Sequence, residues 1–214
     1  QMNDTLDKYL GKIPSTFHWQ QKTYTPLSFA KEVLRFADDY VELVSFSDKL
    51  LYKKFILADK YNWANDSFWN ISLADMQMLV DTALHKGWSV GWEGDVTETG
   101  FNFWDGYARL TVPVVTGSSH NFDEQRLNNY KTEITERDHM LQLAGIGLDE
   151  KGKKWYYMKN SWGSSYLSTY KGYLFMEENY FRMKTVIMMV NKKALPQKLK
   201  EKLTDKFVLV DASI

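Results

Sequence analysis

Two short segments carry residue types that together could move a proton. Asp138, His139 and Met140 stand in a row, and Asn160 follows further along, with Trp162 two residues after it. An imidazole that takes up and returns a proton must keep one orientation and one tautomer, and a hydrogen bond to its second ring nitrogen fixes both. An asparagine side-chain oxygen can accept that bond. The segments therefore predict a working pair, with His139 as general base and acid and Asn160 as its orienting group.

A histidine base held in this way could activate a thiol nucleophile, and the chain contains no cysteine. A free thiol has a pKa of about 8.5, and a neighbouring imidazolium lowers that pKa by several units, so that the reactive thiolate forms near neutral pH. Ser161 is a poor substitute, because it lies beside Asn160 instead of opposite His139. The alternative is that His139 is structural, as a single histidine at the start of an apolar strand most often is.

The elements that would position the pair are strands. Strand-like runs occupy residues 88–92, 140–146, 154–159, 172–176 and 185–190, and residues 149–152 resemble a hairpin turn. An antiparallel pair joined by a turn brings the start of its first strand beside the end of its second. His139 and Asn160 occupy those two places, so we expect them side by side on an antiparallel, barrel-like sheet.

The part of the chain before these strands has a different pattern. Residues 1–86 are predicted to be mostly helical, because Thr25 and Ser72 suit N-cap positions and apolar residues follow each at helical spacing. Residues 87–195 form the predicted sheet-containing lobe. Residues 196–214 form a C-terminal tail that begins charged and ends apolar. The sequence thus predicts an α+β protein in three parts.

Composition excludes several classes of function. The 27 basic and 27 acidic residues give a formal net charge of zero, which argues against nucleic acid as a partner, because such proteins carry a basic patch. No apolar run approaches the roughly 18 residues that span a bilayer, so no membrane partner is expected. The remaining histidines lack the spacing of zinc ligands; they are His18, His85 and His120.

Two further features have an ordinary and a functional interpretation. Asp95 is interpreted as a loop carboxylate that caps a turn, in preference to a catalytic group. The aromatic residues between positions 63 and 104 could form a sugar-binding platform, but we interpret them as core, where aromatic side chains of a mixed fold usually lie.

Several more motifs stand beside the two segments: Tyr24-Thr25-Pro26, Asp39-Tyr40-Val41, Trp88-Ser89-Val90, Asp95-Val96, Gly145 with Gly147, Asn160-Ser161-Trp162-Gly163, and Gly172-Tyr173-Leu174-Phe175-Met176. Together they resemble the C-terminal half of a papain-like cysteine peptidase of the C1 family. The resemblance covers most of the chain and is closest to bleomycin hydrolases and the bacterial aminopeptidases of the C type.

The resemblance implies a papain-like fold and a reaction. An antiparallel, barrel-like sheet lobe would carry His139 and Asn160, preceded by a helical insertion. The reaction would be hydrolysis of N-terminal peptide bonds through a thioester. Trp162 would shield the bond between the pair from water, and Asp138 and Met140 would line the substrate cleft. No metal or organic cofactor is implied.

The resemblance also gives the missing nucleophile a place. Papain-type enzymes have their histidine about 130–150 residues after the cysteine, and the insertion of the bleomycin hydrolase group separates the two further. The Cys-bearing helical lobe is therefore expected before Gln1, in an N-terminal half or a companion chain, and this chain alone is predicted to be inactive. The alternative is a non-catalytic pseudoenzyme or interaction protein that kept the papain-like fold.

Further implications of the resemblance concern partners and location. A peptide substrate is expected, and so is a homo-oligomer, since members of the family assemble as hexamers. A cytoplasmic location is expected, with export or a periplasmic location left open.

Overall fold

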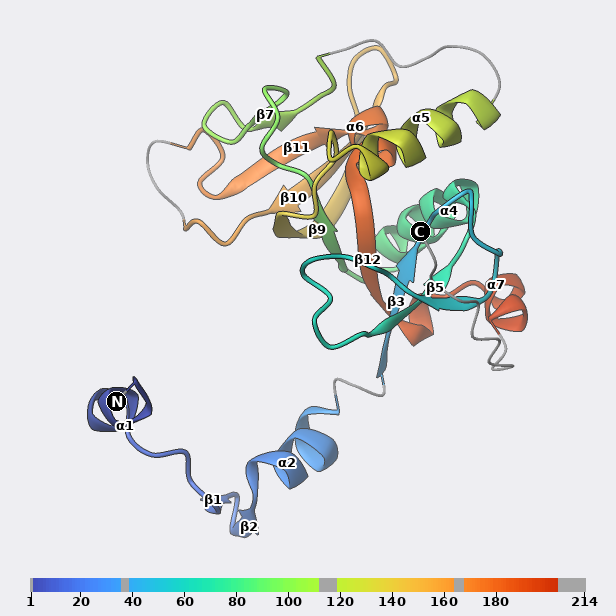
Figure 1. The fold of residues 1–214 in the computed structure, drawn as a ribbon. Helices are drawn as coiled ribbons and strands as arrows, with labels where there is room; N and C mark the ends of the chain where they lie inside the picture. Colours follow the sequence, from blue (N-terminus) through green and yellow to red (C-terminus); the bar gives the residue numbers. More distant parts are fainter. Residues whose placement is uncertain (1, 36–38, 112–118, 164–167, 204–214) are drawn as a thin grey trace. The chain divides into compact units, whose positions relative to one another are not determined.

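The computed structural model describes residues 2–35, 39–111, 119–163 and 168–203 (Figure 1). Contacts divide the chain into two compact units, Gln1–Tyr40 and Val41–Ile214. The apolar end of the predicted C-terminal tail lies outside the described residues. Within the described part, no helix has both the length and the apolar character that crossing a membrane requires.

The first unit is small and is built around one aromatic side chain. Its elements are α1 (Met2–Leu10), β1 (Phe17–Trp19), β2 (Lys22–Tyr24), α2 (Pro26–Phe29) and the π-helical turn η1 (Ala30–Leu34). Phe29 packs edge-on against three rings at centroid distances of 5.2 to 5.4 Å, those of Phe17, Trp19 and Tyr24. The predicted cap at Thr25 is present, since its hydroxyl accepts from the backbone N–H of Ser28.

The second unit is organised by one large sheet, with strands in the order β4-β5-β3-β12-β6-β9-β10-β11-β8-β7 (Figure 1). The strands are β3 (Tyr40–Val44), β4 (Lys54–Ile56), β5 (Ser67–Asn70), β6 (Val90–Gly94), β7 (Phe101–Asn102), β8 (Tyr107–Ala108), β9 (His139–Leu148), β10 (Lys154–Lys159), β11 (Tyr173–Glu177) and β12 (Thr185–Asn191). The runs predicted from sequence correspond to β6 and β9 to β12, which confirms the core of the predicted sheet.

The α+β class is confirmed, but the sheet is mixed and open, not purely antiparallel and barrel-like. Among the described residues, β4 and β7 are two separate edges, so the strands form no closed barrel. β3 pairs with β5, and β11 pairs with β8, in parallel. β9, which begins with His139, pairs antiparallel with β6 on one side and β10 on the other. The antiparallel prediction therefore holds at the strands that position the pair.

Residues 1–86 are a mixture of strands and helices, which corrects the prediction that they are mostly helical. β3, β4 and β5 come from this segment and join the large sheet. β5 is buried along three consecutive residues, so its sequence lacks the alternation that marks a half-exposed strand. The predicted domain boundaries at residues 86 and 195 remain predictions.

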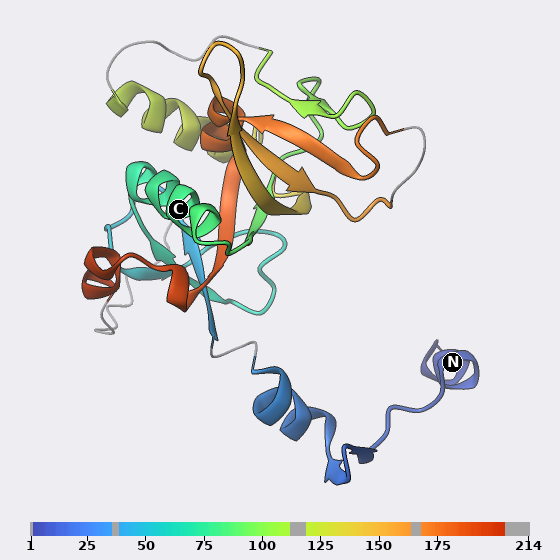
Figure 2. The same cartoon turned by 180° about the vertical axis from the view of Figure 1, so that it is seen from behind.

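Helix α4 (Leu73–His85) packs against the sheet at β6 and β9 (Figure 2), and α6 (Glu178–Lys184) packs at β10, β11 and β12. α4 begins where predicted, because the Ser72 hydroxyl accepts from the backbone N–H of Asp75, and Gly87 follows its end with a φ of +78°. The remaining helices are α5 (Ser119–Lys131), the 3₁₀ turn η2 (Lys192–Ala194) and α7 (Gln197–Lys202).

The core holds the strands on both sides of β9 in place. Its largest fully buried side chains include Trp92 of β6, Tyr156 of β10 and Phe181 of α6. The rings of Tyr156 and Phe181 lie 4.7 Å apart. Burying one large apolar side chain contributes roughly 1.5–3 kcal/mol, so β9 is fixed between two well-anchored neighbours.

Candidate active site

The start of β9 and the end of β10 bring the predicted pair together. Nε2 of His139 lies 2.9 Å from Oδ1 of Asn160. His139 is the first residue of β9, and Asn160 directly follows the last residue of β10. The two strands are antiparallel, with Lys159 opposite Gln142, so their outer ends meet as a hairpin requires.

The contacts of Asn160 define the tautomer of His139. Oδ1 of Asn160 also accepts from the backbone N–H of Ser161 at 2.7 Å, which identifies this atom as the amide oxygen. An amide oxygen only accepts, so the histidine donates from Nε2 and keeps its lone pair on Nδ1. Asn160 is 5% exposed, and its bond to His139 is partly buried.

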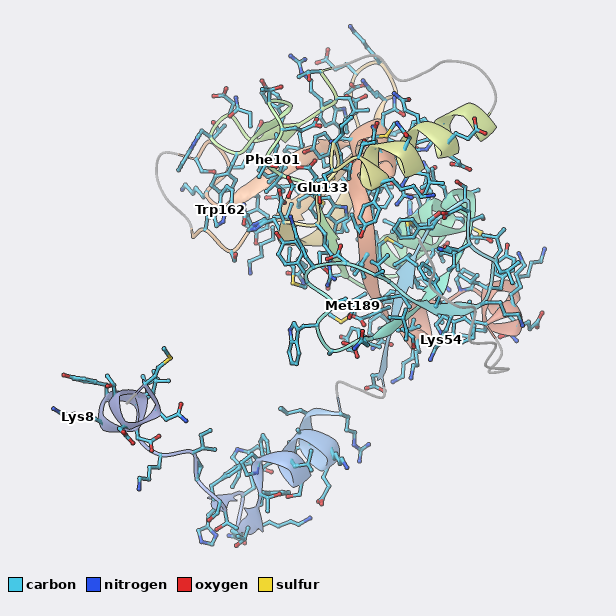
Figure 3. The ribbon with its side chains drawn as sticks, viewed as in Figure 1. Lys8, Lys54, Phe101, Glu133, Trp162 and Met189 are labelled. Atoms are coloured by element: carbon cyan, nitrogen blue, oxygen red, sulfur yellow. The ribbon has the colours of Figure 1, made fainter. Side chains whose placement is uncertain are left out.

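Trp162 lies against the histidine ring. The ring centroids of Trp162 and His139 are 4.9 Å apart. Phe101 and Phe103 pack edge-on against the indole, at 6.3 and 5.0 Å, and Figure 3 shows Phe101 and Trp162 at the same end of the sheet. The indole is half-exposed and stands where a shield for the His139–Asn160 bond would stand. A drier environment strengthens a hydrogen bond.

The two sequence neighbours of His139 differ in their surroundings. Met140 is exposed. Asp138 is half-buried, and its Oδ1 accepts from the backbone N–H of Val96 at 3.0 Å. Burial raises the pKa of Asp138, and hydrogen bonds from Val96 and Thr97 oppose that rise. Asp138 therefore fastens the start of β9 to the loop that follows β6.

An open pocket of about 440 Å³ adjoins the histidine. Its lining residues are Tyr61, Glu93, Arg137, Asp138, His139, Met140 and Ser161. The pocket thus brings together three of the predicted site residues. The other two, Asn160 and Trp162, do not line it and instead contact the ring of His139.

Three lining residues were missed by sequence reasoning. Glu93 on β6 lies opposite Met140 in the strand register, and its carboxylate pairs with Nε of Arg137 at 2.8 Å. Tyr61 comes from a loop between β4 and β5. Only Arg137 had a sequence signal, its position next to Asp138, because the other two reach the site through strand pairing and loop packing.

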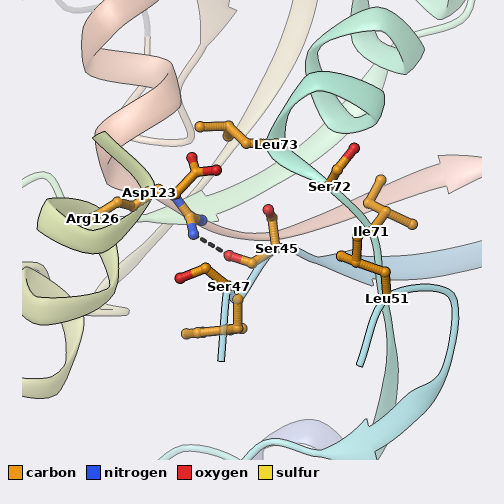
Figure 4. Close-up of a pocket in the computed structure, with 9 residues that line it drawn as sticks. Ser45, Ser47, Leu51, Ile71, Ser72, Leu73, Asp123 and Arg126 are labelled. Atoms are coloured by element: carbon orange, nitrogen blue, oxygen red, sulfur yellow. Dashed lines mark hydrogen bonds between the residues drawn. The ribbon is translucent and has the colours of Figure 1, made fainter. Parts of the chain in front are cut away.

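A second pocket, of about 160 Å³, is a poor candidate for acyl transfer (Figure 4). Three serines line it but no histidine does. The buried guanidinium of Arg126 donates to the backbone carbonyls of Ser45, Arg182 and Thr185. Burial lowers the pKa of Arg126 to about 10. We interpret this arginine as a tie between α5, the residue after β3, α6 and the start of β12.

Comparisons with known proteins show which family the chain resembles. The model of the peptidase C1-like family matches residues 11–212. Aminopeptidase W of Lactobacillus delbrueckii subsp. lactis is 27% identical over 223 residues, which cover 94% of this chain and 49% of the relative. The crystal structure of PepW from Lactobacillus rhamnosis shares 19% identity, with a TM-score of 0.67 over 94% of this chain and 48% of that one. The chain spans about half the length of these relatives.

Proposed function

The chain belongs to the peptidase C1-like family, and on this premise we propose that it is the His- and Asn-bearing part of a thiol aminopeptidase of the bleomycin hydrolase type. The observation that carries the proposal is the 2.9 Å contact between Nε2 of His139 and Oδ1 of Asn160. It leaves the lone pair of the imidazole on Nδ1, the atom that a thiol must reach. The name of one relative, Aminopeptidase W, supports the preference for N-terminal bonds.

The proposed reaction uses a thiol that lies outside these 214 residues, because they include no cysteine. Nδ1 of His139 takes the thiol proton, and the thiolate attacks the carbonyl carbon of the first peptide bond. The imidazolium then protonates the leaving amine as the C–N bond breaks and a thioester remains. Water, deprotonated by His139, hydrolyses the thioester and restores the thiol. Asn160 holds the ring in one orientation through both steps.

The other residues of the site have supporting roles in this proposal. Trp162 keeps water from the His139–Asn160 bond, and Met140 presents an exposed apolar side chain to the substrate. Asp138 fixes the start of β9 through Val96. No step in this reaction calls for a metal or an organic cofactor.

Partners follow from the same proposal. The apolar side chains beside the pocket are exposed, with Met140 at 59%, Trp162 at 50% and Tyr61 at 46%. Contiguous apolar surface is rarely left bare, so we propose that a Cys-bearing half covers it and that the complete protein is a homo-oligomer. The substrate is a peptide with a free amino terminus. A cytoplasmic location remains an expectation.

Hydrolysis of an aminoacyl fluorogenic amide tests the function. The chain alone is expected to be inactive, and activity is expected when a Cys-bearing half is present. That activity should disappear when the thiol is alkylated and when His139 is replaced by alanine. Thiol-dependent hydrolysis by the homogeneous chain, or activity that survives His139→Ala in the complete protein, would overturn the proposal. A folded complete protein without any hydrolysis would support the pseudoenzyme alternative.

A further inference from the structure

A buried lysine contacts both the segment that follows β6 and the segment that leads into β9. Lys184, the last residue of α6, is 2% exposed. Its Nζ lies 2.9 Å from Oδ2 of Asp95 and 2.6 Å from Oε2 of Glu98, both in the segment that follows β6. A charge removed from water is costly unless it is paired, so an ammonium retained here must have a compensating arrangement.

The same ammonium group reaches the segment that leads into β9. Nζ of Lys184 donates to the backbone carbonyl of Ile134 at 2.9 Å. One side chain therefore bridges the chain leaving β6, through Asp95 and Glu98, and the chain entering β9, a few residues before His139. Two carboxylates join the same segments through backbone N–H groups: Asp138 accepts from Val96 at 3.0 Å, and Asp95 accepts from Glu136 at 3.4 Å.

Asp95 is held from several directions. Its Oδ1 accepts from the backbone N–H of Thr97 at 2.9 Å and from the Thr97 hydroxyl at 3.0 Å, which agrees with the predicted turn-capping role. Its backbone carbonyl accepts from the hydroxyl of Tyr180 at 2.8 Å. The carboxylate is 2% exposed. Asp95 therefore offers Lys184 a fixed anchor and not a mobile counter-ion.

The bridged segments meet directly at the histidine. Gly94 is opposite His139 in the pairing of β6 with β9, and its carbonyl accepts from the N–H of Asp138 at 3.2 Å. Gly94 also lies against the backbone of Lys184: a Cβ added there would be 2.1 Å from the Lys184 carbonyl oxygen. The backbone of Lys184 therefore lies next to Gly94, and Gly94 lies next to the first residue of β9.

We propose that Lys184 is a positioning residue, which clamps the exit of β6 to the entry of β9 and so holds His139 within hydrogen-bonding distance of Asn160. The catalytic meaning of this clamp rests on the proposed peptidase function, but the clamp itself is a property of this chain. Lys184 does not line the pocket, so it acts through the backbone and not by contact with substrate.

The test reads the histidine ring directly, by 15N NMR of the imidazole in this chain, with His139→Ala used to assign the signal. Lys184→Met keeps the aliphatic stem and removes the charge and its hydrogen bonds. Lys154→Met is the matched control, because Lys154 also pairs with two carboxylates, Asp81 at 2.6 Å and Glu178 at 3.0 Å, at the end of β10 remote from Asn160. Near-UV circular dichroism confirms that each variant is folded.

The proposal predicts loss of the single Nε2–H signal of His139 in Lys184→Met and its retention in Lys154→Met. If Lys184→Met does not fold, two other variants replace it in the same measurement. The double variant Asp95→Asn with Lys184→Met leaves the net charge unchanged and should lose the His139 signal. The milder variant Glu98→Gln should broaden that signal. An unchanged ring signal in a folded variant would overturn the clamp. Because the spectrum is recorded without any catalysis, the clamp can be confirmed or overturned whether or not the peptidase proposal holds.

Discussion

His139 and Asn160 touch through Nε2 and Oδ1 at 2.9 Å, and the hairpin of β9 and β10 is the reason that they do. The turn joining the strands contains Gly152 with a φ of +75°, a conformation that glycine adopts readily. The pair is therefore positioned by backbone pairing far from the ring, and its chemistry depends on how well the two strand ends are held.

The pair should behave as one unit in the complete protein. His139→Ala removes the group that acts as both base and acid. General acid–base catalysis contributes about 10²–10⁴-fold to a rate, so kcat/KM should fall by at least about 10²-fold. Asn160→Ala removes only the orienting bond and should leave a measurable remainder. Members of such a unit are non-additive, so the double variant should be little worse than His139→Ala in kcat/KM. Equal and additive losses would contradict the assigned roles.

Trp162 should govern the access of water to the bond between the pair. Trp162→Ala exposes Nε2 of His139, so its proton should exchange with solvent faster, and imidazole NMR of this chain would measure the change. Trp63→Ala is the control, because Trp63 is 88% exposed and does not line the pocket beside His139. Equal exchange rates in both variants and the unaltered chain would show that Trp162 is not a shield.

Arg126 should matter for stability and not for the site. Arg126→Met strands three backbone carbonyls that accept from the guanidinium, and a buried unsatisfied group costs about 1–3 kcal/mol, so the free energy of unfolding should drop by at least about 3 kcal/mol. Lys131→Met, which breaks an exposed ion pair with Asp48, should cost less than about 1 kcal/mol. Urea titrations of the two variants make the comparison. Similar small losses would show that Arg126 is not a structural tie.

Asp138 should give stability a specific dependence on pH. Burial raises its pKa in the folded state above the unfolded value, so its contribution is fully present below the unfolded pKa and declines as pH rises through the folded pKa. Asparagine has no such titration and can still accept from Val96. The gain in unfolding free energy on Asp138→Asn should therefore be larger at about pH 7 than at about pH 3, which lies below the unfolded aspartate pKa of about 3.9. A gain that does not change with pH would show that Asp138 is not penalised by burial.

Elements of the fold could be predicted from the sequence where the pattern that specifies them lies within a few neighbouring residues. β10 is found at the residues predicted for it, and β9 begins one residue earlier than predicted. Both could be predicted because alternating apolar residues and the turn between the strands are features of neighbouring residues. β3 was missed and β5 was not located, because the two pair in parallel and β5 is buried along three consecutive residues, so neither shows a short period. The order of the strands, which leaves β4 and β7 at the two edges of an open sheet, likewise depends on pairings between segments that are far apart in the sequence.

The candidate site divides in the same way. His139 and Asn160 could be placed together from one hairpin, which is a local relationship. Glu93 enters the pocket by pairing with β9, and Lys184 reaches Ile134 across fifty positions of sequence. Such contacts depend on the register of a whole sheet, which no motif in the sequence specifies.

The rate at which the thiol is alkylated, measured against pH in a complete protein that joins this chain to a Cys-bearing half, tests the central claim most directly. If His139 activates that thiol, the unaltered protein should react rapidly well below the ordinary thiol pKa of about 8.5, and His139→Ala should shift the profile up towards that value. Asn160→Ala should give an intermediate profile. Superimposable profiles for the unaltered protein and His139→Ala would contradict the claim that this chain supplies the base of a thiol peptidase.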